Sequence, residues 1–233
     1  MVMTRKLLSL FLPLALLGCS STASNPALDQ VRDLSGGQIL GDATSLYWST
    51  ERVTGQPVSA SDYVTIGDYG EYQTEYRWEE GVLRELVREG SELRNNELLP
   101  FRLHIRFNRE GDAIYQRYRV DGNVLPVNST QLVQLKQDAS RATEVSQIQS
   151  KQGFDLIQGH WDGQKLETCA GVTFSEVSFN QPMPQVLMSR LATLDSYVAL
   201  VGTARSERIE VEDLLILDDD SRDCISRPEL IED

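Results

Sequence analysis

Alternating basic residues on two neighbouring predicted strands are the side chains best suited to binding chemistry in this sequence. Arg102, His104 and Arg106 alternate with apolar residues, and Arg117 and Arg119 follow at the same spacing after a turn. Because successive side chains of a strand point to opposite faces, all five should share one face of a hairpin. Arginine binds carboxylate and phosphate groups through two parallel hydrogen bonds. The five residues are therefore a candidate anion-binding site.

A row of glutamates allows a second interpretation of the same face. Glu71, Glu75, Glu79, Glu85 and Glu89 lie on the preceding predicted hairpin and could neutralise the basic residues as a ladder of cross-strand ion pairs. Charges on the solvated face of a sheet are common, and exposed pairs add little stability. We favour the neutralised ladder. The two interpretations differ in whether the basic side chains face an open concavity or a row of glutamates.

The sequence carries no pattern typical of a metal centre or of a known catalytic motif. The two histidines, His104 and His160, are too few for a multi-histidine site, and no HExxH, GxSxG, P-loop or GxGxxG motif occurs. The acidic run at residues 218–223 lacks the glycine turn and distal glutamate of an EF-hand loop, so we interpret it as a solvated tail. We expect no metal, no cofactor and no enzymatic activity. A hydrolase built on two carboxylates remains an alternative, because the chain has 35 acidic residues.

Residues 1–18 have the layout of a cleaved signal peptide. Arg5 and Lys6 precede an apolar run at residues 7–17, which is shorter than the roughly 20 residues needed to span a bilayer. The run ends in Leu-Leu-Gly-Cys at residues 16–19, which resembles the lipobox of bacterial lipoproteins. The resemblance implies cleavage before Cys19, a diacylglycerol on its thiol and an acyl chain such as palmitate on the new amino terminus. Several acyl chains give stable membrane anchoring.

The residue after Cys19 indicates the destination. Ser20 rather than Asp follows the lipidated position, and by resemblance to the sorting rule of Gram-negative lipoproteins this implies the periplasmic face of the outer membrane. The alternative is an ordinary secreted protein with a chance cysteine at position 19.

The charge balance limits the partners that the chain could bind. The 233 residues include 22 Lys and Arg against 35 Asp and Glu, which gives a formal charge of −13, and no basic run occurs. Nucleic-acid binding requires a basic face, so we expect no nucleic-acid partner. Hydrophobic residues at 40% and charged residues at 24% are typical of a globular protein and exclude a disordered, collagen-like or coiled-coil chain. Membrane attachment should therefore depend on the lipid and not on charge.

Two of the three cysteines are predicted to form a disulfide. With Cys19 lipidated, Cys169 and Cys224 remain as an even number in an oxidising compartment. On the chain-entropy model, a bond between them would contribute about 4 kcal/mol. A reactive thiol is the alternative, although neither cysteine belongs to a CxxC motif or has a basic neighbour.

Hydrophobic periodicity predicts a mainly β protein of the α+β class. After a lipidated tether at residues 19–44, residues 45–152 should form an antiparallel meander of six or seven strands and a long covering helix at 129–152, with a cap at Asn128 or Ser129 and a stop at Gly153. Residues 153–233 follow the order β-β-β-α-β-β, which is that of a small OB-like unit. An acidic tail should end the chain.

Across nearly its whole length the chain resembles an uncharacterised family of Gram-negative lipoproteins of unknown function. The resemblance is carried by residues 16–19 (LLGC), 100–107 (PFRLHIRF), 115–118 (YQRY), 197–202 (YVALVG) and 214–217 (LLIL). The resemblance implies localisation at the outer membrane. It implies no biochemical mechanism, because the function of the family is unknown.

Three functional hypotheses follow. The first is a non-enzymatic outer-membrane lipoprotein that contacts an envelope protein or a cell-wall polymer. The second is a carrier or binder of a lipid or of another small amphiphilic or anionic ligand, held between the curved meander and its helix. The third is an enzyme, for which a carboxylate pair in a deep cleft would be required. A tightly filled interface between sheet and helix would exclude the second.

Overall fold

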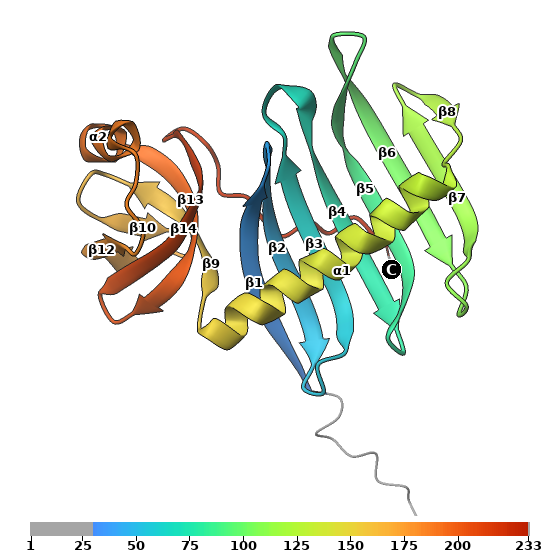
Figure 1. The fold of residues 1–233 in the computed structure, drawn as a ribbon, viewed down its shortest axis with the longest axis horizontal. Coiled ribbons are helices and arrows are strands. Elements are labelled where there is room, and N and C mark those ends of the chain that lie inside the picture. Colours follow the sequence, from blue (N-terminus) through green and yellow to red (C-terminus); the bar gives the residue numbers. More distant parts are fainter. Residues whose placement is uncertain (1–29, 233) are drawn as a thin grey trace, which may run out of the picture.

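The large sheet is a meander of eight antiparallel strands, each paired with its neighbours in the chain (Figure 1). The protein is described by a computed structural model, which covers residues 30–232. Glu80-Gly81 and Asp121-Gly122 have the positive φ angles that two-residue hairpin turns require. The meander predicted from the alternating pattern is confirmed, with eight strands in place of the six or seven expected. Its strands are β1 (Val31–Leu40), β2 (Ala43–Arg52), β3 (Pro57–Thr65), β4 (Gly70–Glu79), β5 (Val82–Arg94), β6 (Glu97–Phe107), β7 (Ala113–Val120) and β8 (Asn123–Leu125), with the short helix η1 (Gly67–Tyr69) before β4.

A single long helix, α1 (Ser129–Gln152), crosses one face of this sheet diagonally, from β7 to β1 (Figure 1). Its start is fixed by a capping box between Asn128 and Gln131, and its end by Gly153 in the left-handed conformation. Leu135, Ala139 and Ala142 are buried against the sheet. The predicted covering helix is therefore confirmed with its expected bounds.

The second sheet curls into a nearly closed, barrel-like unit. The predicted third strand is two short strands, β11 and β12, which lie at opposite edges of the sheet although one residue separates them in the chain. β12 pairs in parallel with β14. Because β11 and β12 are the two edge strands and adjoin in the chain, the two edges of the sheet curl toward each other. The elements are β9 (Asp155–Trp161), β10 (Leu166–Thr168), β11 (Thr173–Phe174), β12 (Glu176–Phe179), helix α2 (Gln185–Thr193), β13 (Ser196–Arg205) and β14 (Arg208–Asp219).

The two sheets share one apolar core on the face of the meander opposite α1. Leu46 and Tyr63 of the meander pack in one buried cluster with Tyr197, Val201 and Leu215 of the second sheet. All residues of β13 from Ser196 to Gly202 are buried, because one face of the strand contacts the meander and the other faces the interior of the barrel-like unit. The two units are therefore packed against each other as one body.

The tether predicted for residues 19–44 is wrong from residue 31 onward, because residues 31–40 form β1. The Ser, Gly and Gln residues of β1 interrupt the apolar alternation by which a strand is predicted from sequence. A Cβ atom at Gly36 would lie 2.1 Å from Gln149 Oε1 of α1, and one at Gly37 would lie 2.3 Å from Leu215 Cδ1 on the other face. At Gly37 the backbone carbonyl oxygen of Ser45 would also lie 2.7 Å from a Cβ atom, so glycine lets the chain approach its neighbours closely at the buried middle of β1. The signal peptide and Cys19 lie outside the described residues, and within residues 30–232 no helix is long and apolar enough to cross a membrane.

The acidic run at residues 218–223 is mainly exposed, as expected. The end of the chain is nevertheless not a free tail, because residues 220–232 run back across the outer face of the meander (Figure 1). We call this segment the C-terminal strap. Ser61 Oγ donates to the Pro228 carbonyl at 2.8 Å, and Arg227 donates to Thr50 Oγ1 at 2.9 Å. The backbone N–H groups of Leu230 and Ile231 donate to Glu75. Polar residues of the sheet therefore hold the strap. The hydrophobic pattern of the sequence does not indicate these contacts, because few of them involve apolar side chains.

Candidate ligand-binding site

A cavity of about 250 Å³ lies between α1 and strands β4 to β7. Its walls are mainly apolar and include aromatic rings from the sheet and from η1, with a few polar side chains. The apolar residues are Ile66, Tyr69, Tyr72, Phe101, Leu103, Tyr118, Val127 and Leu135, and the polar ones are Arg88, Ser91, Glu92, Gln131 and Gln134. The interface between helix and meander is thus incompletely filled, as a ligand-binding protein requires.

The cavity exists because α1 approaches the two halves of the sheet differently. Over β1 to β3 the helix presents the small residues Ala142, Thr143 and Ser146, which are buried and let the backbones come close. Over β4 to β7 it presents larger residues such as Leu135, and it makes few close backbone contacts there. A wedge of space therefore opens toward the N-terminal half of the helix, and side chains of the sheet fill it only in part.

A buried ionic network forms one end of this space. Arg88 Nη2 donates to Asp138 Oδ2 of α1 at 3.0 Å and to the Tyr76 hydroxyl at 3.0 Å, and Arg88 Nε donates to Thr74 Oγ1 at 2.8 Å. Tyr76 in turn donates to Asp62 Oδ2 at 2.7 Å. The Arg88 and Asp138 side chains are only 11% and 13% exposed. The network links β3, β4, β5 and α1 across the interface.

The two carboxylates of the network are compensated unequally. Asp138 lies 3.0 Å from Arg88 and 4.0 Å from Arg141, whereas Asp62 forms no ion pair with the described residues. Burial raises the pKa of Asp62 above its ordinary 3.8, although Arg88 and Tyr76 act to lower it. Asp62 Oδ1 is buried and accepts no hydrogen bond from the described residues. Protonation of Asp62 would therefore remove the one buried carboxylate of the network that has no ion-pair partner among the described residues.

Asp62→Asn is expected to remove a pH-dependent loss of stability. Because the folded-state pKa of Asp62 is raised, its stabilising contribution is complete below pH 3.8 and is lost as the pH rises through the folded-state value. The free energy of unfolding of the wild type should therefore fall, relative to that of Asp62→Asn, as the pH rises from below 3.8 to neutral. Urea denaturation at a series of pH values measures this difference.

The matched control for this measurement is Asp42→Asn, at an exposed turn position between β1 and β2. It should leave the pH dependence of stability as it is in the wild type. If the free energies of unfolding of Asp62→Asn and of the wild type changed with pH in parallel, Asp62 would not be the uncompensated carboxylate.

A second polar cluster lies at the cavity wall formed by β5 and β7. The Tyr118 hydroxyl donates to Glu92 at 2.9 Å, and Arg94 Nη2 donates to the Tyr118 hydroxyl at 3.0 Å. Burial, together with Glu92, raises the pKa of Tyr118. The half-exposed Arg94 and Glu92 are accessible to solvent, and the exposed ring of Tyr69 also borders the cavity. This cluster can bond the polar group of a ligand whose apolar part is inside.

The predicted basic residues lie on the opposite face of the meander and do not reach the cavity. Arg102 is paired with Glu89, and His104 Nε2 lies 2.6 Å from Glu85 Oε1, which is also 3.9 Å from Arg106 Nε. Arg117 and Arg119 are exposed and form no ion pair with the described residues. The structure thus places glutamates beside three of the five residues and leaves the two on β7 open.

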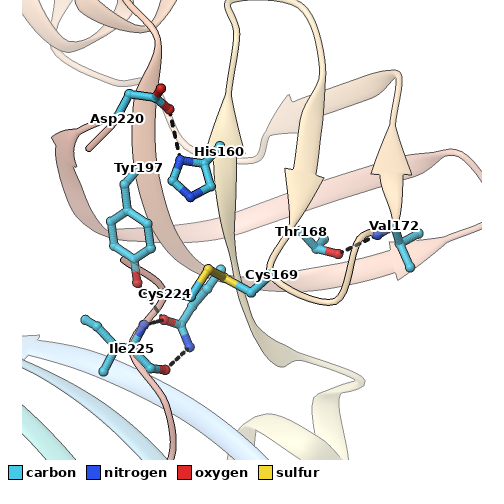
Figure 2. Close-up of a disulfide and its surroundings, with 9 residues drawn as sticks. His160, Thr168, Cys169, Val172, Tyr197, Asp220, Cys224 and Ile225 are labelled. Atoms are coloured by element: carbon cyan, nitrogen blue, oxygen red, sulfur yellow. Dashed lines mark hydrogen bonds and ion pairs between the residues drawn. A yellow bond between two sulfur atoms is a disulfide. The ribbon is translucent and has the colours of Figure 1, made fainter. Parts of the chain in front are cut away.

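The disulfide between Cys169 and Cys224 is present, with a Cα–Cα distance of 6.0 Å (Figure 2). It joins the end of β10 to the beginning of the C-terminal strap. Figure 2 shows Ile225 beside it, where the backbone of Ile225 exchanges two hydrogen bonds with the side chain of Gln158. His160 lies 2.9 Å from Asp220 in the same view. These contacts fix the strap where it leaves the second sheet.

Sequence reasoning missed the residues that build the cavity. Asp62, Arg88 and Asp138 come from two strands and a helix, and each looked like an ordinary surface charge. One signal was available for Arg88, which shares the inward face of its strand with buried Leu86. Among residues 30–232, no group of three or more His, Cys, Asp or Glu side chains is arranged to hold a metal ion.

A comparison with protein-family models places most of the chain in a family. A protein-family model described as a protein of unknown function (DUF1481) matches residues 35–229. The match begins within β1 and ends within the C-terminal strap, so it covers both sheets and both helices. No curated protein and no solved structure matches the chain.

Proposed function

Since the chain belongs to the DUF1481 family, whose function is unknown, we propose a function from the geometry of its cavity. The protein is a non-enzymatic lipoprotein of the outer membrane, facing the periplasm, and its folded body binds a small amphiphilic ligand between α1 and the meander. The observation that carries the proposal is the apolar cavity of about 250 Å³ in an interface that a purely structural helix would fill.

The lining of the cavity supports an amphiphile with a largely apolar body. Ligand sites of proteins are mostly apolar with a few polar groups that fix orientation, and this cavity has aromatic and aliphatic walls with Arg88 and Glu92 among its polar members. Arg88 is already engaged by Asp138, Tyr76 and Thr74. A charged head group would therefore gain little at the buried end. The apolar part of the ligand should lie inside, with its polar group near Glu92, Arg94 and Tyr118.

Anchoring at the membrane rests on the sequence of residues 16–19. A lipid on Cys19 would hold the protein at a surface where amphiphiles are abundant, and the residues between Cys19 and β1 would separate the folded body from that surface. A cavity that takes an apolar group from water gains roughly 25 cal/mol per Å² of apolar surface buried. Lipid anchoring and ligand binding therefore support the same role, that of a membrane-tethered binder. Contact with an envelope protein or a cell-wall polymer is the competing role.

Val127→Trp is expected to abolish ligand binding by filling the cavity. Val127 is half-buried in the loop before α1 and lines the space. A dansyl-labelled fatty acid is a suitable probe, because its emission rises when the dye leaves water. We expect saturable binding to the mature wild-type protein and at least about tenfold weaker binding to Val127→Trp, which corresponds to about 1.4 kcal/mol.

Val124→Trp is the matched control, because Val124 on β8 is 67% exposed and does not line the cavity. Its binding curve should equal that of the wild type, and thermal unfolding of both variants checks that they are folded. Failure of the wild type to bind any apolar probe saturably would reject the proposed function and favour a role in protein or polymer contacts. Equal binding by Val127→Trp would place the ligand elsewhere.

A further inference from the structure

The outer face of β6 and β7 carries a strip of positive charge that the proposed ligand cavity does not use. We call Arg102, Arg106, Arg117 and Arg119 the arginine strip. Strand pairing sets Arg119 directly opposite Arg102, sets Arg117 opposite His104, and sets Arg106 opposite Tyr115. Directly opposed side chains of antiparallel strands have Cβ atoms about 5 Å apart, and diagonal neighbours about 7–8 Å. Two neighbouring guanidinium groups, such as those of Arg102 and Arg119 or of Arg106 and Arg117, therefore lie within reach of one small ligand.

Carboxylates compensate only one side of the strip. Glu89 pairs with Arg102, and Glu85 lies beside His104 and Arg106, all on the side of β5. On the side of β7, Arg117 and Arg119 have no carboxylate partner among the described residues. Four arginines against two glutamates leave a local excess of positive charge on a chain whose formal charge is −13.

The arrangement is unfavourable for the fold alone. Like charges directly opposite on neighbouring strands destabilise a sheet, and Arg102 opposes Arg119 near the free edge of the meander. The C-terminal strap relieves only Arg102, whose Nη2 donates to the Leu230 carbonyl at 3.4 Å. Arg117 and Arg119 stay open, and Arg106 is 61% exposed with its carboxylate partner, Glu85, at 3.9 Å. The 40% exposed ring of Tyr115 lies among them.

We infer that the open part of the arginine strip binds a small ligand through a phosphate or diphosphate group. A phosphate accepts paired hydrogen bonds from the planar fork of a guanidinium, and two or three arginines on one face can share its oxygens. A membrane surface is a poorer partner, because the remaining acidic body would be repelled by anionic lipids. The site lies on the face opposite α1 and is therefore independent of the amphiphile cavity.

Isothermal titration calorimetry with pyrophosphate at low ionic strength tests the inference. We expect saturable binding to the mature wild-type protein and at least about tenfold weaker binding to Arg117→Gln/Arg119→Gln. The control, Lys151→Gln/Arg205→Gln, removes the same charge from exposed positions outside the strip and should bind like the wild type. Inorganic phosphate should bind more weakly than pyrophosphate.

Stability and vesicle binding separate the remaining outcomes. Because both substituted side chains are exposed and opposed by like charge, the thermal midpoint of Arg117→Gln/Arg119→Gln should not fall, so lost binding would not reflect lost folding. The inference is overturned if pyrophosphate does not bind, if both double variants bind equally, or if phosphatidylglycerol vesicles bind through the strip and pyrophosphate does not. None of these outcomes depends on the fatty-acid probe of the cavity.

Discussion

Arg88→Met is expected to lower the free energy of unfolding by about 3–5 kcal/mol, the typical cost of removing one partner of a buried ion pair. Arg88 is the buried positive charge of the network, and its guanidinium bonds Asp138, Tyr76 and Thr74 and stacks 4.2 Å above the Tyr72 ring. Without it, Asp62 has no cation beside it, and Asp138 keeps only the longer contact with Arg141. Urea denaturation at neutral pH measures the loss.

Arg141→Met is the matched control, because Arg141 also approaches Asp138, at 4.0 Å, but its side chain is 37% exposed against 11% for Arg88. Exposed pairs contribute between 0 and about 1 kcal/mol, so this variant should lose far less. The double variant Arg88→Met/Asp138→Leu should be more stable than Arg88→Met alone, because it also removes the stranded carboxylate. If Arg88→Met and Arg141→Met lost the same stability, the buried network would not hold the helix to the sheet.

Cys169→Ser/Cys224→Ser should lower the free energy of unfolding by about 4 kcal/mol, the value the chain-entropy model assigns to a loop of this length. The two cysteines are 55 positions apart, and the bond joins the second sheet to the strap. We also expect the strap to open more often. The amide protons of Leu230 and Ile231, which donate to Glu75, should then exchange faster with solvent than in the wild type.

Dithiothreitol provides the control for this variant. Reduction should bring the wild type to the stability of Cys169→Ser/Cys224→Ser and should leave the variant unchanged, because the variant has no bond to lose. Equal stability of the two proteins under oxidising conditions would contradict a structural role for the disulfide. Fast exchange at Leu230 and Ile231 in the oxidised wild type would contradict the strap as a fixed element.

The buried network and the disulfide stabilise different interfaces of the same body. The network holds α1 to one face of the meander, and the disulfide holds the strap and the second sheet to the other. The cavity lies on the first of these faces and the arginine strip on the second. Substitutions at one candidate site should therefore leave ligand binding at the other unchanged, since no hydrogen bond or ion pair among the described residues joins them.

Much of the architecture could be predicted from local patterns. Alternation such as Phe101, Leu103, Ile105 and Phe107 indicated strands with one buried face, and the spacing of Leu132, Leu135, Ala139 and Ala142 indicated α1. Such patterns report which face of an element is buried. They fail where the buried residues are not apolar side chains, as at Gly36 and Gly37 in the middle of β1. They also fail in the strap, whose contacts to the meander are mainly polar.

The sequence alone determined the element types, because they depend on residue types at short spacing, and the cysteine pairing, because Cys169 and Cys224 are the two cysteines left once Cys19 is set aside. Only the tertiary structure decided where the charges lie. Asp62, Arg88 and Asp138 are far apart in the chain, with 50 positions between the last two, and meet because β3, β5 and α1 pack together. The cavity has the same origin, since it is the space left where α1 diverges from the sheet. Charge pairing and empty volume are properties of packed elements, so no local pattern could predict them.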